Sequence, residues 1–146
     1  MEREEIILFK GKNSPLSNLN ILEDGLVYKY HKFNCSEQAY QWEKAIYNGK
    51  PSIAKRILQE TDSYKQMKIG RTIDTNSDWK KNKKDFMREI LKFKLINSPR
   101  YREALIQSED KPIVEDTTNE FWGRGKRNTG LNTLGQLHCE LRLALI

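Results

Sequence analysis

Hydrophobic residues recur along most of the chain at the spacing of one face of an α-helix. Apolar side chains three and four positions apart repeat through long stretches, with lysines and glutamates between them. This periodicity places apolar groups on one side of a helix and leaves the polar groups facing water. It predicts six helices, at residues 36–47, 51–58, 63–69, 77–97, 100–107 and 132–145.

β-Branched and aromatic residues gather in a few short runs outside these helices. Such residues favour extended backbone, and turn-forming residues bound each run. They predict strands at residues 5–9, 26–30 with 31–33, and 112–115. We therefore expect a mainly helical α+β fold with a small β-sheet, formed by one domain over residues 1–146.

Short local patterns set the expected helix ends. Asn34 is followed three residues later by Glu37, the spacing of a capping box in which the second side chain reaches back to the helix start. Ser77 or Asp78 is expected to cap the longest helix, which should end before Pro99.

Composition excludes several classes of protein. The 146 residues suit one domain, and 5 Phe, 6 Tyr and 3 Trp argue against a disordered chain. No apolar run approaches the roughly 20 residues needed to cross a bilayer, and the first ten residues lack the pattern of a secretory signal. We expect a cytoplasmic protein without a membrane partner.

The net charge and the potential metal ligands exclude fewer classes of protein than the composition does. A net charge of +6 favours anionic partners such as phosphates, nucleotides or nucleic acid. Much of the excess lies in residues 79–84, where a solvated lysine face is the simpler interpretation. Cys35 and Cys139 are expected as reduced thiols, and together with His31 and His138 they lack the spacing of a zinc site. We expect no metal and no cofactor.

Two segments carry side chains that a packed core does not require. In the first, the early turns of a helix that must also pack carry the polar side chains of Ser36, Glu37, Gln38, Gln41 and Lys44. Glu37 and Gln41 are four residues apart, and Gln41 and Lys44 are three apart, so these side chains share a face. Glu37 is either a functional carboxylate or only a helix cap.

The second segment is a glycine-rich loop that leads into the last helix. Trp122 is followed by Gly123 and Gly125, and residues 130–135 continue the pattern. Glycines let the backbone approach a ligand closely, an indole ring offers a stacking surface, and a helix start offers N–H donors. The combination suits a phosphate-bearing nucleotide, with a tight loop around a buried Trp as the alternative.

In their order along the chain, these segments resemble the NADAR, or YbiA-like, family. The resemblance covers nearly the whole chain, and the ordered set of pieces is more specific than any one piece. The pieces are Phe9 with residues 15–18, residues 36–38 with Gln41 and Lys44, Gly70 and Arg71, Trp79 with Met87 and Lys94, residues 113–115, 121–125 and 130–135, and Leu141 with Arg142.

The resemblance implies a YbiA-like domain that cleaves an N-glycosidic bond. Substrates of the family are pyrimidine intermediates of early riboflavin synthesis and, in some members, ADP-ribose attached to guanine in DNA. The implied partner is a phosphorylated ribosyl heterocycle or ADP-ribose, carried in the second case by DNA. The oligomeric state is left open.

The resemblance also implies the site residues. The family's acidic residue falls on Glu37, its helix lysine on Lys44 and its tryptophan on Trp79. Where members carry Asp three residues before Trp-Gly, this chain has Asn119 followed by Glu120. Either Glu120 substitutes for that Asp, or the Asp is dispensable, or the activity is altered. These five residues are assigned to catalysis, and ligand contacts are assigned to Ser17, Asn18, Ser36, Gln41, Arg71, Trp122, Gly123, Gly125, Asn132 and Gly135.

Cleavage of an N-glycoside needs negative charge near the anomeric carbon and a placed water, and a carboxylate supplies both. We assign these tasks to Glu37. Trp79 and Trp122 either stack on the base or belong to the core. Lys44 and Arg71 hold phosphate or stabilise the leaving base, and Lys44 alternatively forms a Schiff base with opened ribose. Two other functions stay open: a non-catalytic module that binds ADP-ribose or NAD, and a basic nucleic-acid-binding domain.

Overall fold

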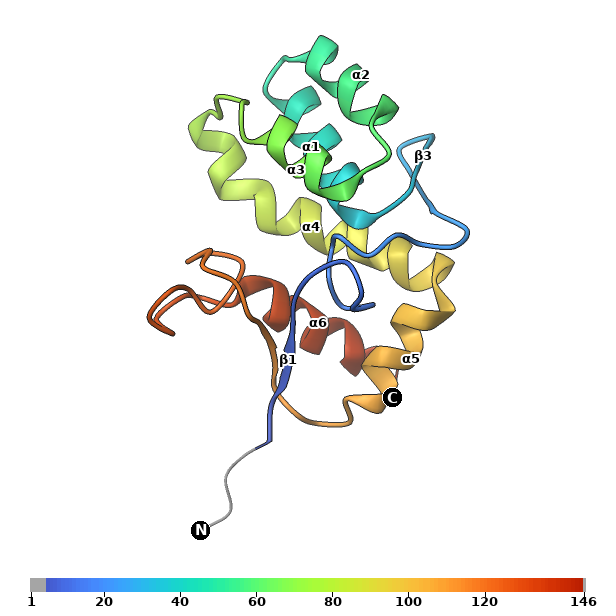
Figure 1. Ribbon diagram of the computed structural model, residues 1–146, viewed down its shortest axis with the longest axis vertical. Helices are drawn as coiled ribbons and strands as arrows, with labels where there is room; N and C mark the ends of the chain where they lie inside the picture. Colours follow the sequence, from blue (N-terminus) through green and yellow to red (C-terminus); the bar gives the residue numbers. More distant parts are fainter. Residues whose placement is uncertain (1–4, 146) are drawn as a thin grey trace. The chain divides into compact units, whose positions relative to one another are not determined.

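The computed structural model describes residues 5–145, which fall into two compact units (Figure 1). One unit contains residues 18–98, and the other joins the described part of residues 1–17 to residues from 99 onward. Each unit has its own two-stranded sheet and its own buried apolar residues. A unit built from both ends of the chain requires a long-range strand pairing, which β1 and β4 provide.

Four helices and a β-hairpin form the unit of residues 18–98. Helix α1 packs against α2, α3 and α4, so it is the central helix of this unit. Nine of its 12 residues are buried, which places its polar side chains inside the unit. The elements are β2 (Leu26–Tyr28), β3 (His31–Phe33), α1 (Ser36–Tyr47), α2 (Pro51–Gln59), α3 (Ser63–Gly70) and α4 (Ser77–Asn97).

Aromatic rings fill the core of this unit beneath the hairpin. Tyr28 packs edge-on against Trp42 and against Phe93, with ring centroids 6.4 and 6.0 Å apart. Its hydroxyl donates to the Glu43 carboxylate, with 2.5 Å between the oxygens. The ionised carboxylate also accepts from Lys29 at 2.5 Å, so the hairpin turn is fastened to α1. Buried charge is tolerated here because it is paired.

The other unit consists of two parallel strands and two helices. The strands β1 and β4 pair over three residues each, with Ile7 opposite Ile113. Helix α6 packs against β4 and against α5, and Figure 1 shows α6 running behind the strand pair. The elements are β1 (Ile7–Phe9), α5 (Pro99–Gln107), β4 (Ile113–Glu115) and α6 (Thr133–Leu143).

His138 occupies the core of this second unit. It is fully buried, its Nδ1 lies 2.6 Å from the Tyr101 hydroxyl, and its Nε2 lies 2.8 Å from the Leu16 carbonyl oxygen. Both ring nitrogens therefore have protein partners, and the Phe9 ring packs against the imidazole edge. His138 links the loop after β1 to α5 and α6, so its role is structural.

The sequence predicted this architecture closely. The mainly helical α+β class is confirmed, and the six helices of the described residues lie where the periodicity placed them. The strands contain three residues each and form two separate two-stranded sheets. The cap predicted for α4 was wrong, because Asn76 is the N-cap and its Oδ1 accepts the Trp79 N–H at 2.8 Å. The single domain over residues 1–146 stays a prediction.

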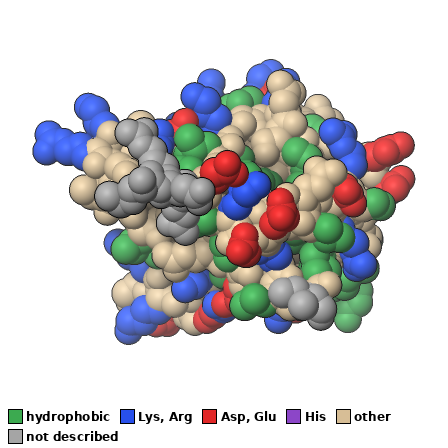
Figure 2. Space-filling view, turned by 90° about the horizontal axis from the view of Figure 1, so that it is seen from below, with side chains coloured by type: hydrophobic (Ala, Val, Ile, Leu, Met, Phe, Trp, Pro, Cys, Tyr) green, Lys and Arg blue, Asp and Glu red, His purple; other side chains and the backbone are tan. Residues whose placement is uncertain are grey.

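The surface of the described residues carries mixed charge. Figure 2 shows basic and acidic side chains interspersed on one face, with hydrophobic side chains between them. No helix within residues 5–145 is long and apolar enough to cross a membrane. Over the same residues, His, Cys, Asp and Glu side chains nowhere gather in threes that could hold a metal ion.

Candidate active site

Glu37 lies in the first turn of α1, the central helix of its unit. The loop before the helix fastens this turn, because the Glu37 N–H donates to the Asn18 carbonyl at 3.0 Å and the Ser36 hydroxyl donates to Asn18 Oδ1 at 2.8 Å. The Glu37 side chain is 8% exposed, and its Oε1 accepts from Gln41 Nε2 at 2.9 Å. Three residues assigned to ligand contacts, Asn18, Ser36 and Gln41, thus surround the assigned acid.

The alternative in which Glu37 is only a helix cap is wrong. The side chain that reaches back to the helix start belongs to Gln38, whose Oε1 accepts the Asn34 N–H at 2.7 Å. The N-cap residue is Cys35, which makes no side-chain capping bond. The Glu37 carboxylate instead lies along the helix toward Gln41.

Burial and nearby cations act in opposite directions on Glu37. Burial raises the pKa of the Glu37 carboxyl, because the charged form loses its hydration. The hydrogen bond from Gln41 and the charges of Lys44 and Arg71 act to lower that pKa. Protonation of Glu37 is therefore set by groups of the same site, as is usual for catalytic acids and bases.

Lys44 lies two turns along α1 from Glu37 and is half-buried. Its ammonium donates to the Gly70 carbonyl at 2.9 Å, which brings the end of α3 next to α1. Burial lowers the pKa of Lys44, Glu37 raises it, and the charges of Lys83 and Arg71 lower it further. The Glu37 carboxylate is thus accompanied by two mutually repelling cations, Lys44 and Arg71, an arrangement that an anionic ligand relieves.

Lys83 is a member of this cluster that the sequence did not single out. It lies half-buried on α4, and burial together with the charge of Lys80 lowers its pKa. The sequence assigned the lysines of this segment to a solvated face. A signal was present, because Lys83 follows the buried Trp79 by four residues and so shares its side of the helix.

Trp79 lies in the aromatic core of the same unit. It is 2% exposed, and its ring stacks on Phe86 with centroids 5.4 Å apart and an interplanar angle of 17°. Tyr40 and Tyr47 pack against it at 5.5 and 5.6 Å. These contacts correspond to the core alternative that the sequence left open for this residue.

Arg71 and Ser17 occupy different surroundings. Arg71 is exposed, follows α3 directly, and lies near enough to Glu37 and Lys44 for its charge to act on both. Ser17 is 3% exposed and belongs to the other unit, where its N–H donates to the Ser14 carbonyl at 3.0 Å. Within residues 18–98, the assigned residues Asn18, Ser36, Glu37, Gln41, Lys44 and Arg71 form one cluster.

The second predicted segment is an ordered loop of the other unit, and Asn119 shapes its start. Asn119 Oδ1 accepts the N–H groups of Phe121 and Trp122 at 2.9 and 2.7 Å. An Asp offers the same acceptor, so Asn119 can replace the family's Asp in this structural task. Trp122 is half-buried and packs edge-on against Phe121, with centroids 4.7 Å apart.

Glu120 and the loop glycines pack against one another. A Cβ atom built on Gly125, whose φ is +77°, would lie 2.5 Å from the Glu120 carboxylate, which is 3.4 Å from the Thr129 hydroxyl. A Cβ atom on Gly123 would overlap the Thr117 hydroxyl. Close packing against Thr117 thus requires glycine at position 123, the positive φ favours glycine at position 125, and a catalytic role for Glu120 stays a prediction.

Asn132 and Gly135 join α6 to strand β4. Asn132 Oδ1 accepts the Glu115 N–H and its Nδ2 donates to the Ile113 carbonyl, both at 2.9 Å. A Cβ atom on Gly135 would overlap the same Ile113 carbonyl, so only glycine permits this approach. The side-chain amide of Asn132 is therefore engaged by the backbone of its own unit.

The start of α6 does not offer all the N–H donors that the sequence suggested. The N–H groups of Thr133 and Leu134 donate to the carbonyls of Phe121 and Trp122 at 3.0 and 3.1 Å. The loop thus folds back onto the helix and occupies these donors. The expectation that they serve a phosphate was wrong for these two groups.

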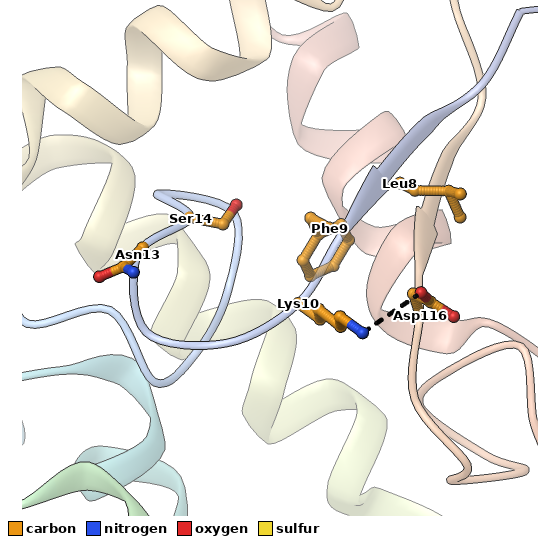
Figure 3. Close-up of a pocket in the computed structure, with 6 residues that line it drawn as sticks. All are labelled: Leu8, Phe9, Lys10, Asn13, Ser14 and Asp116. Carbon is orange, nitrogen blue, oxygen red and sulfur yellow. Dashed lines mark ion pairs between the residues drawn. The ribbon is translucent and has the colours of Figure 1, made fainter.

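A cavity of about 430 Å³ lies at the carboxyl ends of the parallel strands β1 and β4 (Figure 3). Lys10 and Asp116, which directly follow the two strands, line it and form an ion pair with 3.9 Å between their charged atoms. Asp116 also accepts from Arg124 at 2.8 Å. The lining residues are Leu8, Phe9, Lys10, Asn13, Ser14 and Asp116, and the sequence assigned none of them to the site.

Known proteins resemble this chain over most of its length. The NADAR domain family model matches residues 8–146. The chain is 30% identical over 109 residues to N-glycosidase Npun_R5314 of Nostoc punctiforme. The alignment covers 73% of this chain and 70% of that protein.

Two eukaryotic proteins show the same level of identity. The chain is 30% identical over 130 residues to protein irg-1 of Caenorhabditis elegans and over 128 residues to the chloroplastic riboflavin biosynthesis protein PYRR of Zea mays. The alignments cover 78% and 80% of this chain, but only 61% of the nematode protein and 20% of the maize protein. The chain therefore spans less than two thirds of either relative.

The fold also has a counterpart among solved structures. The NMR structure of the Escherichia coli protein YbiA superposes with a TM-score of 0.82 and 24% sequence identity. The match covers 99% of this chain and 87% of the other. The arrangement of helices and short strands is thus that of YbiA.

Proposed function

The chain belongs to the NADAR domain family, and on this premise we propose that it is a hydrolase that cleaves the N-glycosidic bond between a ribose phosphate or ADP-ribose and a heterocyclic base. The observation that carries the proposal is a buried carboxylate, Glu37, accompanied by the cations of Lys44 and Arg71. Relatives named N-glycosidase and riboflavin biosynthesis protein support the reaction class.

In the proposed reaction, positive charge develops on the ribose C1′ as the bond to the base lengthens. The ionised Glu37 stabilises this charge and takes a proton from the attacking water. The water oxygen forms the new bond to C1′, and the electron pair of the broken bond leaves with the base. Gln41 holds the carboxylate in place at 2.9 Å, so that it need not reorient during the reaction.

Lys44, Arg71 and Lys83 are proposed to hold the substrate's phosphate. Lys44 and Arg71 act on the Glu37 carboxylate and Lys83 acts on Lys44, so the cluster has an excess of positive charge that a phosphate dianion neutralises. The same charges favour departure of an anionic base, which is then protonated by Lys44 or by water. We also propose that the second segment, residues 119–135, contacts the ligand.

Lys44 allows one alternative chemistry, because burial lowers the pKa of its ammonium and thereby favours the neutral amine. A neutral amine would attack C1′, the base would leave with the electron pair of the broken bond and take up the proton released by the amine, and opening of the sugar ring would convert the C1′–amine adduct to an imine. Borohydride reduces such an imine to a stable secondary amine. A protein that gains the mass of the reduced adduct at Lys44 supports this route, and an unmodified Lys44 after trapping with substrate contradicts it.

The proposed function is tested by supplying both substrate types to the protein. Phosphorylated riboflavin-pathway pyrimidines should release free base, or DNA with ADP-ribosylated guanine should release free ADP-ribose, as followed by chromatography. The Glu37→Gln variant serves as the control for release that depends on the carboxylate.

Tight binding of ADP-ribose or NAD without release from either substrate would contradict hydrolysis and indicate a binding module. Salt-sensitive DNA binding that Glu37→Gln leaves unchanged, again without release, would indicate a nucleic-acid-binding domain instead.

A further inference from the structure

Gly70, the last residue of α3, lies against the side chain of Gln41. A Cβ atom built on Gly70 would overlap the Gln41 side-chain amide and would lie 2.9 Å from its Cγ. Gln41 is 6% exposed and has its Nε2 committed to the Glu37 carboxylate. The amide therefore occupies the space that any side chain at position 70 would need.

The backbone of Gly70 contacts the other charged residue of the cluster. Its carbonyl oxygen accepts from the Lys44 ammonium at 2.9 Å. Gly70 thus contacts both residues. Its lack of a side chain leaves room for the Gln41 amide, and its carbonyl oxygen binds the Lys44 ammonium. The sequence identified Gly70 only as a helix end and as part of the family resemblance.

The orientation of the Gln41 side-chain amide also shows that this amide is committed to Glu37. Its Oε1 is buried and has no hydrogen-bond partner among the described residues, whereas its Nε2 donates to Glu37. A buried acceptor without a partner is unfavourable and needs an explanation. The hydrogen bond to Glu37 explains why Oε1 has no partner. Turning the amide to give Oε1 a partner would remove the Nε2 donor from the carboxylate.

We propose that Gly70 is a positioning residue of the candidate active site, because the absence of a side chain there lets Gln41 hold the Glu37 carboxylate while the Gly70 carbonyl holds Lys44. The inference rests on the proposed function for its catalytic meaning. The geometric part, in which position 70 acts on Glu37 through Gln41, is tested without any substrate.

Backbone strain does not explain a glycine at this position. Gly70 is absent from the glycines with positive φ, which are Gly11, Gly25, Gly49 and Gly125 among the described residues. An alanine is therefore compatible with the backbone, and alanine is also favoured over glycine within helices. The main cost of Gly70→Ala is the displacement of Gln41.

The experiment measures the pKa of Glu37 by NMR, through the ¹³C shift of its carboxyl carbon, in the ligand-free protein. The variants are Gly70→Ala, Gln41→Ala and the double variant. The Gln41 hydrogen bond lowers the pKa of Glu37, so its loss should raise that pKa measurably. Gly70→Ala should produce a similar rise, and it should add nothing in the Gln41→Ala background.

Gly49→Ala is the matched control. Gly49 also ends a helical segment, has a φ of +71°, and has no atom within 4 Å of a Cβ built on it. Alanine there should lower the melting temperature through backbone strain and leave the pKa of Glu37 unchanged. A general loss of stability is thereby separated from displacement of Gln41.

Two outcomes would overturn the inference. One is an unchanged pKa of Glu37 in Gly70→Ala, and the other is a further rise when Gly70→Ala is added to Gln41→Ala. Should Gly70→Ala fail to fold, the double variant must fold, because the overlapping side chain has been removed, and an unfolded double variant also contradicts the inference. Because the titration needs no turnover, a protein without glycosidase activity refutes the proposed function while the positioning result stands.

Discussion

The side-chain amide of Gln41 donates to the carboxylate of Glu37, one turn earlier in α1, with 2.9 Å between Nε2 and Oε1. Glu37→Gln preserves an acceptor for this bond and the size of the side chain. We therefore expect a folded protein whose turnover is about 100-fold to 10,000-fold lower, the usual loss when a general base is removed. Initial rates and the melting temperature measure the two effects. The exposed Glu23→Gln is the control and should react at the wild-type rate.

The raised pKa of Glu37 predicts the direction of two pH dependences. Activity needs the ionised form, so it should fall as the pH drops through a value above the ordinary carboxyl pKa. A raised folded-state pKa also means that the folded state retains a proton which the unfolded state has lost, so ionisation of Glu37 lowers stability as the pH rises. Glu37→Gln should therefore be more stable than the wild type at pH 7, with the advantage disappearing below about pH 4. Urea unfolding that gives the same difference at both pH values contradicts this.

The helices could be predicted because their positions depend on a local periodicity. Glu37 could be placed on a helix in the same way, but the hydrogen-bond partner of its side chain could not be predicted. Whether Glu37 or Gln38 reaches back to the helix start depends on the tertiary packing of both side chains, in which Gln38 also donates to the Ile57 carbonyl in α2 at 2.9 Å. A capping-box pattern describes only contacts between neighbouring residues at the helix start and does not include this tertiary packing.

Lys83 and Gly70 escaped prediction for a related reason. Helical spacing places Lys83 near the buried side of α4, but only the packing of α4 against α1 brings it near Lys44. The requirement for glycine at position 70 comes from Gln41, which is 29 positions earlier in the chain. Long-range approaches of this kind leave no periodic trace in one sequence.

Asn119 is predicted to act through its oxygen, which accepts two backbone N–H groups of the loop. Asn119→Asp retains this acceptor and should change stability little. Asn119→Ala leaves both N–H groups without it and should cost roughly 0.5–2 kcal/mol, as for lost helix caps. Chemical unfolding of both variants measures the difference. A higher turnover in Asn119→Asp would show that the charge of the family's Asp has a catalytic effect beyond the fold.

Lys83 is predicted to strengthen binding of phosphorylated substrate. Lys83→Ala removes one of the cations around Lys44 and should raise KM several-fold for a phosphorylated substrate, with a smaller effect on its dephosphorylated counterpart. Lys81, exposed on the same helix, provides the matched control, and Lys81→Ala should leave both KM values near those of the wild type. Equal effects of the two alanine variants would indicate a general change of surface charge and contradict a specific phosphate contact.

Lys94 is fully buried in α4, and burial lowers its pKa to about 7. Below that pH the folded state carries the cost of a buried ammonium, so the difference in stability between Lys94→Met and the wild type should favour the variant most at pH 6. Between pH 7 and the ordinary lysine pKa, the folded state has lost a proton that the unfolded state keeps, so wild-type stability rises relative to the variant by about 1.4 kcal/mol per pH unit. Urea unfolding at pH 6 and pH 9 measures this convergence. The exposed Lys92→Met should differ from the wild type by the same amount at both pH values, and a constant difference for Lys94→Met would mean that the buried amine is not the titrating group.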